Sequence, residues 1–308
     1  MIIIYTKNIY GSGAKIWSLN QINFLIKKHS KDKIYLIAND KFIRHIKNNK
    51  KTILKKINAV KNIYVFFLKN LFSHEIKKFY NLGDYPLPFI KDQILYVNQA
   101  NLIKPYIYIY SSKELKFKIR RLYFDIFKKN IKCIYVQSLF MKKNILKSYS
   151  FMIKIFISIY NLKKTTLKFK YFRRKTIKVF YPADFYEYKN FNLIQNYLLN
   201  YNQDRKISFF FLESVKSKIK NPELYKFQKN FKNYNVYKVF LKYDAIVYPS
   251  FIESYALPLA EAKKINIPVI SANLNYAKNH KIKNIFYFNP SSLNSFSKAL
   301  QRLKQYYE

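Results

Sequence analysis

The sequence predicts an α/β protein with two domains, each built on a parallel β-sheet. Short apolar segments, typical of buried strands, alternate with longer amphipathic segments, typical of helices, along most of the chain. The chain has 308 residues, which suffice for two domains of about 150 residues each. A segment at residues 163–175 is dense in lysine, threonine and arginine and lacks an apolar period. This segment is the expected linker between the two domains.

The amino-terminal half is expected to begin with a strand at residues 2–5, a turn that contains Gly11 and Gly13, and a helix at residues 15–28. Each later strand is predicted from a short apolar run, and each later helix from apolar residues three or four positions apart. Those strands are expected at residues 34–38, 63–67, 93–98 and 132–137, and those helices at residues 42–48, 73–79, 113–129 and 139–148. Ser138 precedes the last helix and is its expected N-cap.

The helix expected at residues 113–129 is amphipathic. Its apolar stripe consists of Leu115, Ile119, Leu122, Tyr123 and Ile126. A stripe of this kind is typical of a helix that packs against a core.

The carboxyl-terminal half repeats the alternation of strands and helices. Its strands are expected at residues 177–181, 207–212, 245–248, 269–271 and 285–288, and its helices at residues 191–201, 222–229, 236–242, from 258 onward and 293–307. Alternating strands and helices favour parallel sheets with right-handed crossovers. The sequence therefore predicts two Rossmann-like domains, at residues 1–170 and 176–308, which face one another and bind ligands in the cleft between them.

The composition and the net charge limit the kinds of binding partner that are expected. Half of the residues are apolar and 19% are aromatic, so a packed core is expected rather than disorder. The formal net charge is +42, but 51 of the 58 basic residues are lysines, which are spread over the whole chain. Arginine is the preferred residue for reading phosphates and bases. The charge is therefore interpreted as a solvated surface or as attachment to an anionic membrane surface, and a nucleic-acid partner is not expected.

Cysteine usage and apolar runs indicate the compartment. Cys133 is the only cysteine, so no disulfide within the chain is expected and a reducing cytosol is the natural setting. The first apolar run is short and is interrupted by Lys7, unlike a signal peptide. The run at residues 151–162 contains Lys154 and is too short to span a bilayer. The expected location is the cytoplasm, with a peripheral position at the inner face of the membrane as an option.

The most informative segment is residues 244–262, DAIVYPSFIESYALPLAEA. An apolar strand leads into a loop that carries Glu253, and a helix follows with Pro258 expected at its first position and Glu261 in its first turn. The backbone N–H groups of this loop and the positive end of the helix suit an anion, and the loop residues expected to bind it are Ser254, Tyr255, Ala256 and Leu257. The two carboxylates can accept hydrogen bonds from hydroxyls. The layout suits a ligand that has both phosphates and sugar hydroxyls.

This segment resembles the donor-binding signature of the retaining, group 1 (family 4-like) GT-B glycosyltransferases, often written E-x7-E. The matching residues are Asp244, Pro249, Ser250, Glu253, Leu257, Pro258, Glu261, Ala262, Pro268, Val269 and Ile270. The resemblance implies the GT-B fold, contact of Glu253 with the transferred sugar, and binding of the ribose hydroxyls by Glu261. Without the resemblance, Glu261 could simply stabilise the helix dipole and Glu253 could be an exposed loop residue. The family usually has glycines where this chain has Ser254 and Ala256.

Further segments resemble the same family. Tyr181-Pro182-Ala183, followed by Tyr188-Lys189-Asn190, resembles the start of the donor-binding domain, where a lysine contacts the donor diphosphate. That lysine would be Lys189, but the arginine that many members carry a few residues earlier is missing. The amino-terminal glycine loop of the family approaches the donor phosphates, which gives Gly11 and Gly13 a binding role beside the simpler interpretation as a tight turn. Residues 81–84 and 98–99 resemble loops that border the acceptor site.

The resemblance implies a glycosyltransferase that moves a sugar from a nucleotide-diphosphate sugar to a glycan or lipid-linked acceptor with retention, in cell-envelope polysaccharide or glycoconjugate synthesis. Lys189 and the helix that opens at Pro258 would stabilise the leaving diphosphate, so no metal and no further cofactor are expected. Two alternatives remain. The missing glycines, the missing arginine and the short carboxyl-terminal half would suit a catalytically degenerate GT-B relative, and the net charge alone would suit a basic nucleic-acid-binding protein.

Overall fold

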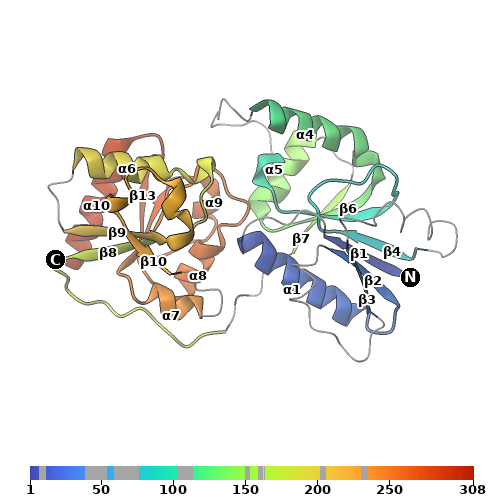
Figure 1. The fold of residues 1–308 in the computed structure, drawn as a ribbon, viewed down its shortest axis with the longest axis horizontal. Helices are drawn as coiled ribbons and strands as arrows, with labels where there is room; N and C mark the ends of the chain where they lie inside the picture. Colours follow the sequence, from blue (N-terminus) through green and yellow to red (C-terminus); the bar gives the residue numbers. More distant parts are fainter. Residues whose placement is uncertain are drawn as a thin grey trace. The chain divides into compact units, whose positions relative to one another are not determined.

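The computed structural model describes residues 1–6, 12–38, 54–58, 76–102, 114–149, 153–158, 162, 164–201, 206–229 and 235–308. The chain divides into two compact units, Met1–Tyr160 and Asn161–Glu308 (Figure 1). Most of the segment predicted as a linker is described within the second unit and has no helix or strand. It is nevertheless attached to that unit, because the N–H of Phe169 donates to the carbonyl of Ile265 at 2.7 Å.

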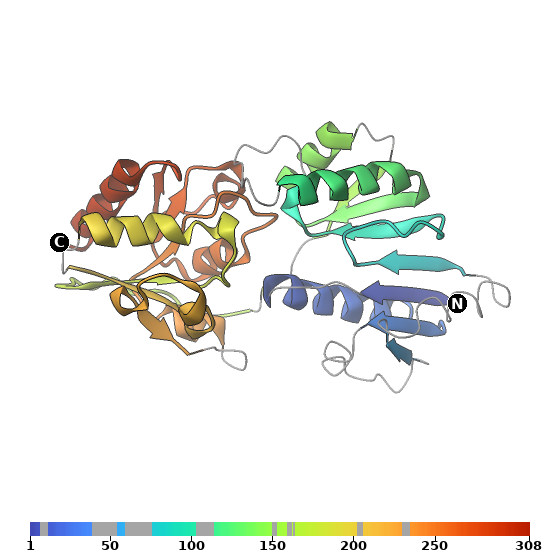
Figure 2. The same ribbon diagram turned by 45° about the horizontal axis from the view of Figure 1, so that its top comes forward.

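The first unit is built on a parallel sheet of seven strands. In the order β3-β2-β1-β4-β5-β6-β7, these are Leu54–Asn58, Ile34–Ala38, Ile2–Thr6, Lys78–Asn81, Gln93–Val97, Ile131–Val136 and Lys154–Ile157. All neighbouring strands pair in parallel, and in Figure 2 the strand arrows of this unit point the same way. Every residue of β1 is buried, as expected for a central strand covered on both faces.

Among the described residues of the first unit, three α-helices overlap predicted ones. They are α1 (Ser12–Lys28), α4 (Glu114–Phe127) and α5 (Leu139–Tyr149), and two short 3-10 helices, η1 (Ala100–Leu102) and η2 (Lys128–Asn130), are also described. The Oγ atom of Ser138 accepts a hydrogen bond from the N–H of Met141 at 3.2 Å, which confirms the predicted N-cap of α5.

Three predictions in this half need comment. The helix expected at residues 42–48, the strand expected at 63–67 and Gly11 lie outside the described residues. The helix expected at residues 73–79 is wrong in its described part, because β4 begins at Lys78 and lies between β1 and β5. Phe79 and Tyr80 are buried in this strand. β4 and β7 have four residues and β3 has five, and all three contain lysine. No uninterrupted apolar run therefore marks them as strands, which also explains why β3 and β7 were not predicted.

The second unit is built on a parallel sheet of six strands. In the order β10-β9-β8-β11-β12-β13, these are Lys226–Gln228, Ile207–Leu212, Ile177–Tyr181, Ala245–Tyr248, Val269–Ala272 and Ile285–Phe288. All neighbouring strands again pair in parallel. The strands expected at residues 177–181, 207–212, 245–248 and 285–288 are confirmed with the predicted bounds.

The helices of the second unit are α6 (Phe191–Asn200), α7 (Val236–Phe240), α8 (Leu257–Ile265), α9 (Asn275–Lys278) and α10 (Leu293–Tyr307), with the 3-10 helices η3 (Glu187–Lys189), η4 (Glu213–Lys218) and η5 (Pro222–Leu224). The helix predicted at residues 222–229 is wrong. The chain makes only η5 there and then enters β10 at the edge of the sheet.

Both units therefore have the doubly wound parallel sheet of a Rossmann-like fold, as predicted. The strand order reverses direction between β1 and β4 in the first unit and between β8 and β11 in the second. Ligands of such folds bind outside the carboxyl ends of the strands at this switch point. Among the described residues, no helix is both long and apolar enough to cross a membrane.

Candidate functional site

The candidate site lies at the switch point of the second unit, where β8 and β11 pair side by side. β8 leads through residues 182–186 into η3, and β11 leads through residues 249–256 into α8. Both connections leave the sheet at its carboxyl edge, so the sequence motifs around Lys189 and Glu253 meet there. The backbone joins them directly, because the N–H of Phe251 donates to the carbonyl of Tyr188 at 2.8 Å.

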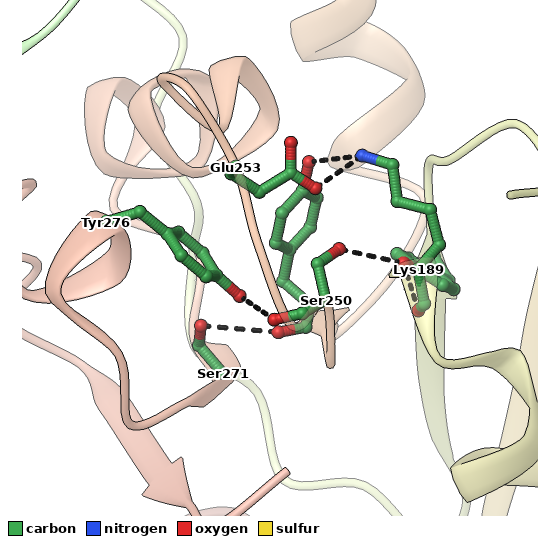
Figure 3. A network of polar contacts seen from close by, with 7 residues as sticks. Lys189, Ser250, Glu253, Ser271 and Tyr276 are labelled. Atoms are coloured by element: carbon green, nitrogen blue, oxygen red, sulfur yellow. Dashed lines mark hydrogen bonds and ion pairs between the residues drawn. The ribbon is translucent and has the colours of Figure 1, made fainter. Parts of the chain in front are cut away.

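Lys189 and Glu253 form a buried ion pair at the centre of this site. The Nζ atom of Lys189 lies 2.5 Å from Oε1 of Glu253 and donates to the hydroxyl of Tyr248 at 3.2 Å. Each of the two charged side chains is 11% exposed. The Nζ atom also lies 5.3 and 5.2 Å from the ring centroids of Tyr188 and Tyr248. The structure thus brings together the two residues predicted to act in catalysis (Figure 3).

A network of hydrogen bonds supports the backbone next to the ion pair. The hydroxyl of Tyr181 donates to the carbonyl of Lys189 at 2.7 Å and lies 3.2 Å from Oγ of Ser250. The hydroxyl of Tyr276 donates to the carbonyl of Ser250 at 2.6 Å, and Oγ of Ser271 donates to the carbonyl of Tyr248 at 3.3 Å. Figure 3 shows the side chains of Tyr276 and Ser271 pointing toward the segment that contains Ser250. The network fixes the backbone on both sides of the Lys189–Glu253 pair.

Sequence reasoning missed the tyrosines of this network. Burial, with the charge of Glu253 as a further cause, raises the pKa of Tyr181 and of Tyr248 well above the usual value. These phenols therefore remain neutral and act as hydrogen-bonding groups. Tyr181 was noted only as part of a family match, and with 30 tyrosines in the chain nothing in the sequence assigned these phenols a supporting role.

Asn190 belongs to the Tyr188-Lys189-Asn190 match, but the sequence assigned it no role. Its backbone is left-handed, with φ at 56°, which asparagine tolerates better than most residues. Its side-chain amide donates to the carbonyls of Pro249 and Pro290, at 3.3 and 2.9 Å. Asn190 therefore ties η3, which carries Lys189, to the loop that follows β11.

The amino end of α8 follows directly on the loop that carries Glu253. Ala256 is its N-cap, with φ at 55°, and no side chain caps the helix. Within the first turn of α8, Pro258 has no N–H, and the N–H of Leu259 donates to the carbonyl of Ala256 at 2.9 Å. An anion would therefore meet the N–H of Leu257 and the positive end of the helix dipole. This end of α8 therefore suits an anion, and the binding role of residues 254–257 stays a prediction.

The bounds of α8 correct two sequence predictions. The helix begins at Leu257, so Pro258 occupies its second position and not its first. Proline is tolerated there because the N–H of this position also lacks a partner within the helix. Glu261 is consequently beyond the first turn, which contains no acidic residue. Stabilisation of the helix dipole is therefore a weaker explanation for Glu261 than the sequence suggested.

Glu261 is half-buried on α8 and lies close to two tyrosines. Burial raises the pKa of Tyr237 and Tyr255, and the negative charge of Glu261 raises it further. Tyr255 belongs to the loop before α8, so the carboxylate of Glu261 is near the residues predicted to bind the ligand. The structure places Glu261 and the Lys189–Glu253 pair on separate elements around the same loop.

His280 supports this loop from outside the motif. Its Nε2 atom lies 2.5 Å from the carbonyl oxygen of Tyr255 and can donate to it. Burial lowers the pKa of His280, so the neutral ring with the proton on Nε2 is favoured. His280 therefore positions the loop, a role that no spacing in the sequence revealed.

The predicted acceptor-side loops form a polar cluster in the first unit. Asp84 is buried with φ at 67°, and its Oδ1 atom accepts hydrogen bonds from the N–H groups of Asn98 and Gln99. The amide of Gln137 donates to Oδ1 of Asn98 at 2.8 Å. These residues follow β4, β5 and β6 and lie at the carboxyl edge of their sheet. Burial raises the pKa of Asp84 to about 7.

Gly13 lies in the first turn of α1, the helix that follows β1 in the first unit. Its predicted role at the donor phosphates stays a prediction, as does that of Gly11. Within the described part of the chain, no group of histidine, cysteine and acidic side chains could hold a metal ion.

Comparisons with known proteins support the fold. A comparison with protein-family models found no match, and neither did a comparison with the sequences of curated proteins. The chain is similar in structure to WaaG, a glycosyltransferase involved in lipopolysaccharide biosynthesis, with a TM-score of 0.64 and 11% identity over 99% of this chain and 90% of that one. It is also similar to sucrose-phosphate synthase from Thermosynechococcus elongatus, with a TM-score of 0.72 and 13% identity over 98% and 89% of the two chains.

A third similar structure is Anabaena HepE in complex with UDP and glucose, with a TM-score of 0.62 and 12% identity over 99% of this chain and 89% of that one. Structural similarity at identities this low establishes the fold and leaves the activity open. The fold is that of the GT-B glycosyltransferases, as the sequence motifs implied.

Proposed function

We propose that this protein is a glycosyltransferase that transfers a sugar from a nucleotide-diphosphate sugar to a glycan or lipid-linked acceptor, with retention of the anomeric configuration. The observation that carries the proposal is the buried Lys189–Glu253 pair next to the start of α8, at the switch point of a Rossmann-like sheet. The similarity to glycosyltransferase structures, among them one crystallised with UDP-glucose, supports it.

Lys189 and the start of α8 would stabilise the leaving diphosphate. During transfer, the bond between the anomeric carbon and the phosphate oxygen breaks, and a bond to the acceptor oxygen forms. Negative charge grows on the diphosphate, and the acceptor hydroxyl loses its proton to that leaving group. An ammonium group and a helix N-terminus held in place before the reaction stabilise this charge without reorganisation. Their positive charge performs the task that a metal ion performs in other transferases.

Glu253 would orient the transferred sugar. A carboxylate can accept several hydrogen bonds, so Glu253 can hold sugar hydroxyls while it remains paired with Lys189. The pairing also keeps the carboxylate in one position, which a sugar contact requires. Glu261 would accept hydrogen bonds from the two ribose hydroxyls of the nucleotide.

The acceptor would bind at the first unit, where the Asp84 cluster presents polar groups at the carboxyl edge of the sheet. We propose a role in cell-envelope polysaccharide or glycoconjugate synthesis, because two of the similar structures are named as a glycosyltransferase of lipopolysaccharide biosynthesis and a lipopolysaccharide outer core galactosyltransferase. Nucleotide sugars and the single cysteine suit a cytoplasmic location.

Calorimetric titration of the full-length protein with UDP, GDP and ADP tests the donor site. We expect one nucleotide to bind, and we expect Glu261→Ala to weaken its binding at least tenfold because the ribose contacts are lost. Glu213→Ala, which removes an exposed carboxylate of the same unit, is the matched control and should bind as the wild type does. The proposal fails if none of the nucleotides binds or if both variants bind equally well.

Turnover separates an active enzyme from a catalytically degenerate relative. The corresponding nucleotide sugar should release its nucleoside diphosphate in the presence of a suitable acceptor, and NMR of the product should show the anomeric configuration of the donor. Nucleotide binding without release for any acceptor would favour the degenerate relative, and an inverted product would exclude retention.

A further inference from the structure

The outer side of α4 in the first unit carries an uncovered row of aliphatic side chains. Leu115, Ile119, Leu122 and Ile126 are 70%, 57%, 60% and 54% exposed. Their spacing of four, three and four residues places all four on one side of the helix. The sequence suggested that this stripe faces a core, and the structure shows the opposite.

The orientation of α4 is fixed by its inner side. Phe124 is fully buried, and its ring centroid lies 4.6 Å from that of Tyr149 at the end of α5. The hydroxyl of Tyr123 donates to the carbonyl of Pro86 at 3.1 Å, and Arg121 is buried. The helix is therefore anchored through its aromatic side, and the aliphatic row remains outside.

A row of this kind differs from ordinary surface hydrophobic residues. Single exposed leucines and isoleucines are normal in folded proteins. Four neighbouring aliphatic side chains, each more than half exposed, form a contiguous apolar strip, and such a strip marks a surface that another body covers.

The charges around the strip indicate which body covers it. Lys118 on α4 and Lys129 just after the helix are exposed. Residues 114–149, which contain α4 and α5, include ten basic and two acidic residues. An aliphatic strip bordered by lysines is complementary to a layer that is apolar inside and negatively charged at its surface.

We propose that α4 docks the protein on the surface of an anionic lipid bilayer. The helix would lie in the plane of the interface, with the aliphatic row at the boundary of the acyl chains and the lysines at the level of the lipid phosphates. Docking of α4 is independent of the transferase reaction, because no residue of the donor site takes part in it.

The composition of the strip argues against two other occupants. The centres of protein–protein interfaces are enriched in tyrosine, tryptophan and arginine and depleted in lysine, unlike this row of leucine and isoleucine bordered by lysine. A second copy of the chain would bring the basic surroundings of both strips together, and the like charges would repel each other.

Vesicle flotation with the full-length protein tests the proposal. The vesicles contain phosphatidylcholine and phosphatidylglycerol in equal parts, or phosphatidylcholine alone. We expect the wild type to float with the anionic vesicles, to float much less with the neutral ones, and to be released by high salt. Leu122→Gln should weaken binding to anionic vesicles about fivefold or more, because one aliphatic side chain leaves the apolar layer.

Leu199→Gln is the matched control. Leu199 lies on α6 in the second unit and is 53% exposed, so the same substitution is made at similar exposure on another helix. Both variants should unfold at the wild-type temperature, since both sites are exposed. The proposal is overturned if the wild type binds no vesicles, if it binds neutral and anionic vesicles equally, or if both variants bind as the wild type does. It is also overturned if light scattering shows that Leu122→Gln dissociates a dimer while vesicle binding persists.

Discussion

The Lys189–Glu253 pair makes a quantitative prediction about stability. Replacing Lys189 with methionine removes the charge and keeps most of the aliphatic length, and replacing Glu253 with glutamine removes the other charge and keeps the shape. Either single substitution leaves a charge without its partner at a site where both side chains are 11% exposed. Breaking a buried ion pair in this way typically costs 3–5 kcal/mol.

The expected magnitude follows from this burial. The pair lies at the end of a sheet and keeps some contact with water, so we expect each single substitution to lower the free energy of unfolding by about 3 kcal/mol, the lower end of that range. The double variant leaves no unpaired charge. It should therefore cost about 3 kcal/mol instead of about 6, which corresponds to a coupling energy of about 3 kcal/mol.

The assay is urea unfolding of the full-length protein followed by two signals. Trp17 is the only tryptophan of the chain and is buried in α1, so its fluorescence reports on the first unit. Far-ultraviolet circular dichroism reports on both units. The three variants should shift the dichroism transition of the second unit and leave the Trp17 transition in place, because two-domain proteins need not unfold in a single step.

Additive costs of the two single substitutions would refute the reasoning. So would single costs below about 1 kcal/mol, the value of an exposed ion pair, because the site would then be open to solvent and unable to hold a carboxylate in place.

Three further predictions concern neighbouring groups. The pKa of Asp84 is about 7 in the folded protein and about 3.9 when unfolded, so its contribution to stability should decline as the pH rises from about 4 to about 7. The decline should reach about 1.4 kcal/mol per pH unit. Asp84→Asn should flatten the dependence of the Trp17 transition on pH. Burial lowers the pKa of His280 below its ordinary value of about 6.5, so its contribution to stability is present above about pH 6.5 and should be lost as the pH falls from there toward the lowered pKa. His280→Gln should reduce this loss in the dichroism transition of the second unit while keeping a donor to the carbonyl of Tyr255. Ala256 has φ at 55°, so Ala256→Gly should raise the free energy of unfolding by about 0.5–1 kcal/mol, and a decrease would show that the alanine methyl group is needed for packing.

The strands that the sequence predicted well are mainly apolar, whatever their length. Ile207–Leu212 has six residues and Ala245–Tyr248 has four, and in both an apolar run without a helical period marks the bounds. β4 and β10 have four and three residues. Pairing with neighbouring strands decides the structure of such short segments, and a local pattern does not contain that information.

The α4 helix shows what an amphipathic pattern leaves open. One side carries leucine and isoleucine, and the other carries Phe117, Phe124 and Phe127. Either side could face a core, and the periodicity of apolar residues does not show which side is buried. In the structure Phe124 is buried and Phe117 and Phe127 are half-buried, consistent with the larger area that an aromatic ring removes from water.

The candidate site was predictable where the motif supplied a context. Lys189 is one of 51 lysines and was found only through the residues that flank it. The left-handed backbone at Ala256 corresponds to a position where the family usually has glycine, so the departure noted in the sequence marks a strained residue. Tyr276 and His280 reach the site from segments outside the matched motifs, and only the folded chain brings them there.

The central claim is that Lys189 holds the diphosphate of a nucleotide at the start of α8. The most direct measurement compares the affinity of the protein for a nucleoside diphosphate and for the matching nucleoside monophosphate by calorimetry, in the wild type and in Lys189→Met, at a temperature where both are folded. We expect the wild type to prefer the diphosphate at least tenfold and the variant to lose most of this preference, because the monophosphate places no charge beside Nζ. An unchanged preference in Lys189→Met would contradict the assignment of the site.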